Sequence, residues 1–423
     1  MFRLERNEQL GLTVLKEKDF NRALTFDLCL ECKDSRFQTL LNQFLPDFNK
    51  SSTKNRIHST KDKKTLEQIL LNLIRCYQMD PDCFLIFAQG NEHYITDRYN
   101  PLKITRQKSI DLKEWLADRK YLKGINGRWS KVTTGMISRV RPTIKLKTIF
   151  ISHKVEQFKI TSHPLNEVIF LKDIKKSKHT PAKYINYKRS SPEANNSRRV
   201  IKKYNELMDK SVITYNGKQL PVSYFHIHRV FNNKDWQQGG RYYGGFQQMS
   251  KNPKKVKKNG VKDRRKLKIN NNSVIEYDYS RIHPTMLYDK IGMPLNKDPY
   301  VPKGYKKRYR NFIKAVFNIM INCLNKKQVH GAATKEAEDD DYSKLNIDSA
   351  FITKLISDLE LTHTNIKQFF YSGEGLKLQY LDSLVATKVI ENFVSQSRAI
   401  IPYHDSFIVE AMHGADLKQV MQD

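Results

Sequence analysis

A short, mainly apolar segment, Val274 to Tyr277, ends on the carboxylate of Asp278 and strongly constrains how this chain can fold. Its length and composition are typical of a strand that enters a hydrophobic core. A carboxylate that is buried without a partner is costly. Asp278 must therefore be paired, protonated, bound to a metal ion or exposed to solvent, and the rest of the sequence has to distinguish among these.

The overall charge indicates a polyanionic partner. The chain has 423 residues, with 75 Lys and Arg against 44 Asp and Glu, which leaves a net charge of +31. Nucleic acid is the commonest partner of so basic a protein, although a ribosomal or membrane-surface type is the alternative. We find no apolar run long enough to span a membrane and no signal peptide, so we expect a cytoplasmic protein, or one located with the nucleic acid it serves. The sequence does not predict an oligomeric state.

The five cysteines do not indicate a metal site or a disulfide framework. Cys29 and Cys32 form a lone CxxC pair without a second pair or a histidine partner nearby. We therefore expect unpaired thiols.

Residues 1–190 are predicted to form a mixed α/β domain of unknown role. Helical periodicity covers Lys63 to Met79, residues 83–90 and 93–99 resemble a hairpin, and Thr143 to Thr161 alternates as one or two strands. The basic, polar stretch from Lys175 to Arg199 contains Pro, Ser and Asn, which favours a linker at the domain boundary.

Residues 200–423 are predicted to form a second domain. Helices are expected over residues 198–215, 305–327 and 379–397, and an exposed acidic loop over residues 336–344. A basic block over residues 251–268 precedes the Asp278 strand and could hold a phosphate backbone, although such blocks are usually solvated loops. Its candidate nucleic-acid contacts are Lys254, Lys255, Arg264 and Arg265.

A second aspartate is predicted at the tip of a C-terminal hairpin. In AIIPYHDSFIVE, the polar trio His404-Asp405-Ser406 separates two apolar runs of strand length, although Asp-Ser is also common in ordinary turns. Asp278 and Asp405 could meet in one sheet. Two carboxylates that share a site repel each other unless divalent cations neutralise them, and hard oxygen ligands beside phosphate suit Mg²⁺. This pattern predicts two-metal phosphoryl chemistry.

The helix between the two aspartates carries a polar row. Arg310 and Lys314 are four residues apart and share a face, which Asn318 and Asn322 continue. Ile313, Val316, Phe317 and Met320 are expected to form the buried side. A basic helical face is normally just solvated, but asparagine is a poor interior helix former, and an incoming triphosphate needs such a cationic row.

These segments together resemble motifs of family A DNA polymerases and of the related single-subunit, phage-type RNA polymerases. DYSRIHPTMLY resembles motif A, RNFIKAVFNIMIN the fingers helix, YHDSFIVE motif C, and DWQQGGRYYGGF a Gly-Arg segment near template and primer. LQYLDSLVATKVIENF resembles the helix that precedes motif C. The motifs occur in the family's order, and the resemblance covers residues from about Arg229 to the C-terminus.

The resemblance implies a right-hand palm with an antiparallel sheet and helical fingers over about residues 300–370. It implies that Asp278, Asp405 and the Tyr279 carbonyl hold two Mg²⁺ ions, or Mn²⁺ in their place, and that Lys314 has a catalytic role. Nucleotide contacts are implied for Arg310, Lys314, Asn318, Asn322, Tyr279 and His283, and contacts with template or primer for Arg241, Gln379 and His404. A small basic polymerase of this type would suit a mobile element.

The chain departs from the family at the position that selects the sugar. His283 stands where the DNA polymerases have a glutamate that excludes ribonucleotides, and Pro284 is expected to stop or kink a helix that starts at Ser280. We expect a DNA polymerase that uses nucleic acid and nucleoside triphosphates. The alternatives are an RNA polymerase or primase-like initiator, a non-catalytic nucleic-acid-binding derivative, and a Mg²⁺ nuclease.

Overall fold

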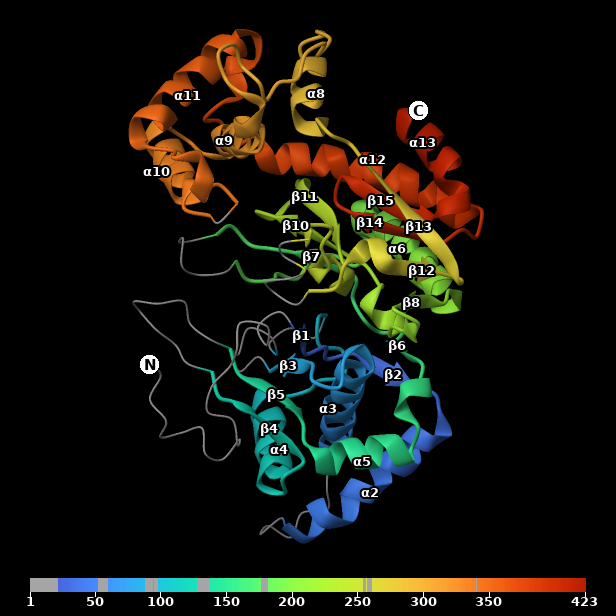
Figure 1. Ribbon diagram of the computed structural model, residues 1–423. Helices are drawn as coiled ribbons and strands as arrows, with labels where there is room; N and C mark the ends of the chain where they lie inside the picture. The colour runs from blue at the N-terminus through green and yellow to red at the C-terminus, as the bar shows by residue number, and fades with distance from the viewer. Residues whose placement is uncertain are drawn as a thin grey trace.

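The computed structural model describes residues 22–51, 60–87, 94, 98–127, 137–175, 182–253, 256, 261–339 and 341–423 (Figure 1). Their fold is mixed α/β with several sheets, in agreement with the predicted class. Among these residues, no helix combines the length and apolar character that a membrane span requires.

The N-terminal part contains a four-stranded and a two-stranded sheet with helices around them. The larger sheet has the order β1 (Ala23–Thr25), β3 (Phe84–Ile86), β5 (Arg139–Pro142), β4 (Leu122–Ile125). The smaller sheet pairs β2 (Leu30–Cys32) with β6 (Ile160–Ser162) in antiparallel fashion. The surrounding helices are α2 (Ser35–Ser51), α3 (Thr60–Met79), α4 (Arg106–Asp118) and α5 (Ile144–Ser152).

Two predictions for this part can be compared directly with the structure. The helix expected from Lys63 to Met79 is confirmed by α3. The strands expected over Thr143 to Thr161 are wrong for most of that range, because α5 occupies its first half and only β6, near its end, is a strand. Burial in α5 follows the helical period: Leu146 and Phe150 are buried, whereas Ile144 is 80% exposed. The second strand of the predicted hairpin lies largely outside the described residues.

The middle of the molecule contains a three-stranded sheet. Strand β10 (His228–Asn232) lies between β7 (Ile169–Leu171), its parallel neighbour, and β11 (Asp235–Tyr243), its antiparallel neighbour. Helix α6 (Pro192–Lys210) begins inside the predicted linker. Proline is tolerated in the first turn, as Pro192 is here, because an N–H at that position would have no acceptor within the helix. The linker is therefore helical at its end, and residues 176–181 of it lie outside the described residues.

The C-terminal part adds a six-stranded sheet of order β14-β15-β13-β12-β8-β9. Its strands are β8 (Ile213–Tyr215), β9 (Lys218–Gln219), β12 (Leu267–Ile269), β13 (Asn272–Asp278), β14 (Ile400–Tyr403) and β15 (Ser406–Glu410). The helices are α8 (Ile282–Asp289), α9 (Arg310–Asn322), α10 (Lys326–Ala337), α11 (Ser349–Thr362), α12 (Gly375–Ser395) and α13 (Gly414–Gln422). The helices expected over residues 305–327 and 379–397 are confirmed in α9 and α12. The helix expected over residues 198–215 is confirmed by α6 as far as Lys210, but Ile213–Tyr215 form β8 instead. Pro284 lies in the first turn of α8, where proline is tolerated, so the expected break does not occur.

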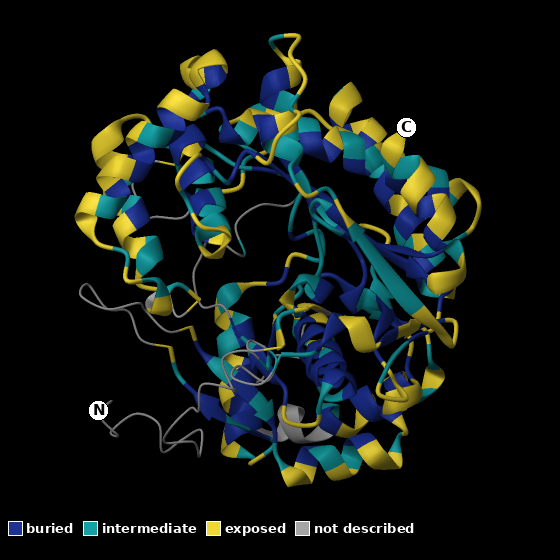
Figure 2. Cartoon of the chain, turned by 45° about the horizontal axis from the view of Figure 1, so that its top comes forward, coloured by how far each residue is buried: buried dark blue, intermediate teal, exposed yellow. Residues whose placement is uncertain are grey.

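Two hydrophobic cores support these elements. One extends from the N-terminal helices to the six-stranded sheet, and the other, which includes Leu287, Phe317, Leu359 and Leu378, lies within the helices from α8 to α12. Figure 2 shows that the long helices turn their exposed residues outward and their buried residues toward the interior. The boundary near residue 190 stays a prediction, and β7 on its N-terminal side pairs with β10 on its C-terminal side.

Arg229 joins the middle sheet to two helices. Its guanidinium donates to the Gly240 carbonyl at 2.6 Å and to the hydroxyls of Ser197 in α6 and Ser383 in α12, both at 2.8 Å. The rings of Phe231 and Tyr242 each lie 4.9 Å from its central carbon. A glycine is required at position 240, where φ is +71° and an added Cβ would lie 2.9 Å from the Phe231 ring.

We expect Arg229→Met to lower the free energy of unfolding by about 2–4 kcal/mol, because it removes a buried donor from three acceptors. Chemical denaturation would measure the loss, and Arg199→Met on the exposed side of α6 is the matched control. Equal stability of the two variants would contradict this role for Arg229.

Candidate functional site

Strand pairing brings the two predicted aspartates together. Strands β13 and β15 are antiparallel, and Asp278 lies opposite Ser406 at the end of the pair. The Tyr279 N–H donates to the Asp405 carbonyl at 2.9 Å, which continues the pairing by one step. The expected hairpin is present, with Asp405 in the turn after His404, whose φ is +61°. Asp278 and Asp405 are thus on neighbouring strand ends, while their role as metal ligands stays a prediction.

A cavity of about 280 Å³ lies beside these strand ends. Most of the predicted site residues line it, although they come from distant segments. The lining residues are Arg241, Tyr279, Ser280, Ile282, His283, Tyr300, Lys314, Asn318, Asn322, Gln379, His404 and Asp405. The fold therefore gathers residues from β11, α8, α9, α12 and the β14–β15 turn around one space.

Asp278 is half exposed and paired with a lysine. Its Oδ2 lies 2.9 Å from the Lys251 ammonium, which also contacts Glu276 at 3.1 Å. The Glu276 carboxylate accepts from Arg264 at 2.6 and 2.9 Å and from the Ser406 hydroxyl at 2.9 Å. Burial acts to raise the pKa of Glu276, but the hydrogen bonds and charge of Arg264 outweigh it and hold the pKa below its usual value. Glu276 is thus an ionised anchor two residues before Asp278.

The sequence reasoning missed Asp382, a buried carboxylate on α12. Asp382 is 4% exposed and accepts from the Arg241 guanidinium through Nε, at 3.1 and 3.2 Å, and through Nη2. The His283 Nε2 lies 2.9 Å from the same carboxylate and 3.2 Å from Arg241. One aspartate therefore holds both the predicted template-contacting arginine and the residue at the predicted sugar-selecting position. Its signal in the sequence was an acidic residue within an otherwise apolar helical run, LQYLDSLVA.

Three of the four residues in the predicted polar row of α9, Lys314, Asn318 and Asn322, line this cavity, whereas Arg310 is not among its lining residues. Ile313, Val316, Phe317 and Met320 are buried on the opposite side, and the Asn322 amide donates to the Asn318 carbonyl at 2.6 Å. The Lys314 ammonium lies 5.9 Å from the Tyr300 ring centre.

Arg310 has a partner that the sequence did not predict. Its Nε donates to Asp298 at 2.6 Å. Burial acts to raise the pKa of Asp298, and the Arg310 hydrogen bond reverses this and lowers it. An anion that used Arg310 would therefore compete with Asp298.

His404 borders both the cavity and Asp405. Burial lowers the pKa of the His404 imidazole, and the nearby Arg241 cation lowers it further by a smaller amount. A neutral ring is therefore expected at neutral pH.

Two of the predicted nucleic-acid contacts in the basic block, Arg264 and Arg265, form ion pairs with carboxylates of this chain. Arg264 is buried, pairs with Glu276, and lies 3.7 Å from the Tyr403 ring centre. Arg265 is 54% exposed and pairs with Asp263 at 2.8 Å. Lys254 and Lys255 lie outside the described residues.

No cluster of three or more His, Cys, Asp or Glu side chains suited to a metal ion occurs within the described ranges. The two strand-end aspartates are a pair rather than such a cluster. No protein-family model matches the chain, and neither the curated proteins nor the solved structures searched contain a significant match.

We expect Asp382→Asn to lower the free energy of unfolding by about 3 kcal/mol, because it leaves the Arg241 cation largely buried without its countercharge. Thermal and urea denaturation would measure the loss. Glu391→Gln, at an exposed position of the same helix, should change the stability by less than about 0.5 kcal/mol. A wild-type midpoint for Asp382→Asn would show that the cluster does not stabilise the fold.

Proposed function

We propose that this protein is a template-directed nucleotidyltransferase, and specifically a DNA polymerase that extends a 3′-hydroxyl with nucleoside triphosphates. The observation that carries the proposal is the pairing of β13 with β15. It places Asp278 and Asp405 at adjacent strand ends, and Asp405 lines a cavity that is also lined by Lys314 of α9. Acidic groups on one side and a cationic helix on the other are the two halves that phosphoryl transfer requires.

The available ligands fit Mg²⁺, or Mn²⁺ in its place. The Asp278 and Asp405 carboxylates and the Tyr279 carbonyl are hard oxygen donors, and Mg²⁺ commonly uses one or two carboxylates together with water and substrate phosphates. The Lys251 ammonium beside Asp278 shows that this carboxylate already attracts a cation. When bound, two such ions would activate the 3′-hydroxyl and neutralise the charge that develops on the phosphates.

The chain's own residues would bind and orient the substrates. Lys314 would hold the triphosphate and donate a proton to the leaving pyrophosphate, and Arg310 would assist once it leaves Asp298. Arg241 would bind the backbone of template or primer. Because Asp382 already holds the Arg241 side chain in one orientation, little conformational entropy would be lost on binding. The 3′-oxygen attacks the α-phosphorus, the bond from that phosphorus to the bridging oxygen breaks, and pyrophosphate leaves.

His283 supports a second candidate, an RNA polymerase or primase-like initiator of the same superfamily. Its imidazole is tied to Asp382 at 2.9 Å at the edge of the cavity. An imidazole there can donate a hydrogen bond to a ribose hydroxyl or accept one from it. The choice between the two sugars thus depends on one side chain whose orientation Asp382 restrains.

Primer extension tests the proposal. The protein should extend a primed DNA template with Mg²⁺ and either dNTPs or NTPs, and Asp405→Ala should reduce the rate by at least about a hundredfold. Asp416→Ala, at an exposed carboxylate of α13, is the matched control and should extend at the wild-type rate. Binding of the template without extension by either sugar type would favour the non-catalytic derivative, and cleavage of the template would favour the nuclease.

We further expect Lys251→Ala to strengthen the binding of divalent cations about two- to fivefold, because it removes a cation that competes for a half-exposed carboxylate. Titration of Mn²⁺ by electron paramagnetic resonance measures this without substrate. Lys268→Ala on β12, which is also exposed, should leave the affinity unchanged. Weaker binding in Lys251→Ala would show that Asp278 is not a ligand in competition with Lys251.

A further inference from the structure

The sheet of β7, β10 and β11 has two different faces. On one face, Arg229, Phe231 and Tyr242 are buried toward α6 and α12. His228 pairs with Tyr243 in the register, and alternation along the strands places them on the other face together with Arg241. Arg241 lines the candidate active site, so the aromatic residues on this face lie next to that site.

Aromatic rings form a continuous row across this face. The ring centres are 5.7 Å apart for His404 and Tyr243, 6.0 Å for Tyr243 and His228, and 5.1 Å for His228 and Phe170. Tyr184 follows, with its ring centre 5.1 Å from that of Phe170. Tyr184 is 38% exposed, and the other four residues are partly buried. The row therefore offers ring surface to a ligand as well as to its own neighbours.

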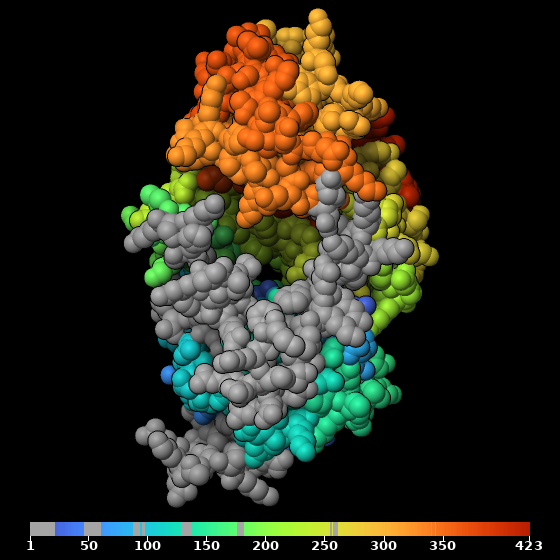
Figure 3. Space-filling model, turned by 60° about the vertical axis from the view of Figure 1, so that its left-hand side comes forward, coloured from blue at the N-terminus to red at the C-terminus, as the bar shows by residue number. Residues whose placement is uncertain are grey.

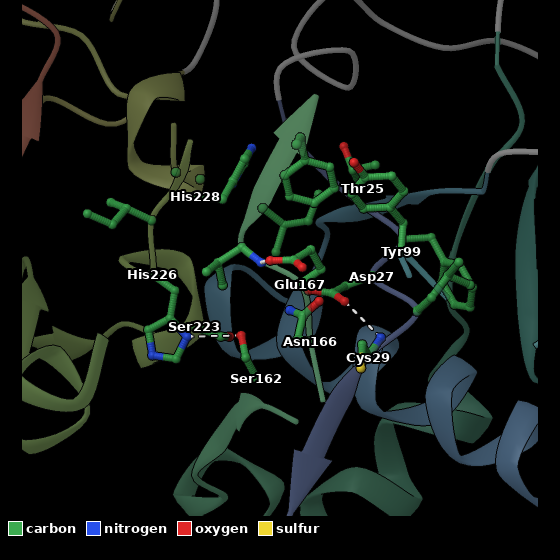
Figure 4. Close-up of a pocket in the computed structure, with 18 of the residues that line it drawn as sticks. Thr25, Asp27, Cys29, Tyr99, Ser162, Asn166, Glu167, Ser223, His226 and His228 are labelled. Atoms are coloured by element: carbon green, nitrogen blue, oxygen red, sulfur yellow. Dashed lines mark hydrogen bonds between the residues drawn. The ribbon is translucent and has the colours of Figure 1, made fainter. Parts of the chain in front are cut away.

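The row ends in a cavity of about 430 Å³ between the middle sheet and the N-terminal part. His228, Phe170 and Tyr184 line it on the sheet side, with Thr25 and Asp27 contributed by the N-terminal part. Figure 4 shows His226 and His228 on one side of this space and Thr25, Asp27 and Tyr99 on the other. In Figure 3, a hollow opens below the α9–α11 helices, and the yellow-green segment that contains β10 and β11 is visible at its back.

The carboxylates near the cavity are neutralised by arginines. Glu167 accepts from Arg98 at 3.2 Å and from Arg198 at 3.1 Å, and Asp27 lies 3.7 Å from Arg75. The cavity wall therefore does not repel an anionic chain as unpaired carboxylates would.

Lysines lie at the outer end of the row. The Lys172 ammonium is 5.7 Å from the Tyr184 ring centre, and Lys175 and Lys183 are exposed close by in the sequence. The rings can stack on the bases of a nucleic-acid strand, and the lysines at the outer end can pair with its phosphates.

We propose that single-stranded nucleic acid leaves the candidate active site along this row, with its bases stacked on Tyr243, His228, Phe170 and Tyr184 and its phosphates toward Lys172. The direction of the strand rests on the proposed function, whereas the binding itself does not. Stacking surfaces of this kind accept every base, because each base has a π-face.

Binding of a short oligothymidylate, measured by fluorescence anisotropy, tests the proposal at the exposed end of the row. Tyr184→Ala should weaken binding roughly tenfold, and Tyr184→Phe, which keeps the ring, should restore it. Ile174→Ala is the matched control, because Ile174 is a nearby apolar residue that is 59% exposed but has no ring. Circular dichroism and the melting temperature would show that each variant is folded.

A stacking signature separates base contacts from charge alone. An oligonucleotide that carries 2-aminopurine should be quenched by the wild-type protein and less so by Tyr184→Ala, while affinity for a blunt duplex changes less than twofold. Unchanged affinity or quenching in Tyr184→Ala would overturn the proposal. If the wild-type protein quenches the probe but extends no primer with either sugar type, only the proposed polymerase function is refuted and the stacking proposal stands.

Discussion

The antiparallel pairing of β13 with β15 is the constraint on which the candidate site depends. A slip of one residue would turn Asp278 to the other side of the sheet and separate it from Asp405. Charged groups hold the register at both ends of the pair. Near the site, Glu276 binds Arg264 and Ser406, and at the far end Glu410 accepts from Asn270 at 2.9 Å and from Asn272 at 2.5 Å. Side chains other than those of the two aspartates thus help to fix where the aspartates lie.

Helix α12 connects this sheet to the helices that carry the cationic row. Ser383 binds Arg229 of the middle sheet, and Asp382 binds Arg241 and His283. At the start of the same helix, Gly375 packs so closely on α9 that an added Cβ would lie 1.9 Å from the Asn322 side chain. A shift of α12 would therefore move Arg241, His283 and Asn322 together. A polymerase that changes shape around its substrates would have to move these residues as one unit, or break the Asp382 contacts.

The buried carboxylates show how a chain of +31 net charge uses its acids. Glu167, Glu276 and Asp382 each bind one or two arginines inside the fold. These carboxylates neutralise some of the arginines, and the exposed lysines remain to face solvent or a polyanion. The basic composition therefore supports a nucleic-acid partner mainly through basic residues that are not paired with carboxylates inside the fold.

Local sequence pattern was sufficient for the elements with a strong period. The helical stripe of α9, the apolar run of α12 and the hairpin around Asp405 could all be predicted, because their side-chain spacing specifies one structure. The same pattern was misleading in α5, where Ile144 and Leu146 alternate with lysines as in a strand. Ile144 and Ile151 are exposed, and the buried pair Leu146 and Phe150 follows the helical period. Which apolar residues are buried depends on neighbours that a short window does not contain.

By itself, the sequence determined that two strand-end aspartates and a cationic helix exist in this protein, because each depends on residues close together in the chain. Only the tertiary structure decided what they contact. It paired Asp278 with Lys251 and Arg310 with Asp298, and placed Asp382 between Arg241 and His283. It also aligned rings from Tyr184 to His404 across one sheet face. These contacts join residues up to 161 positions apart, as Tyr243 and His404 are, and such distant neighbours leave no periodic trace in the sequence.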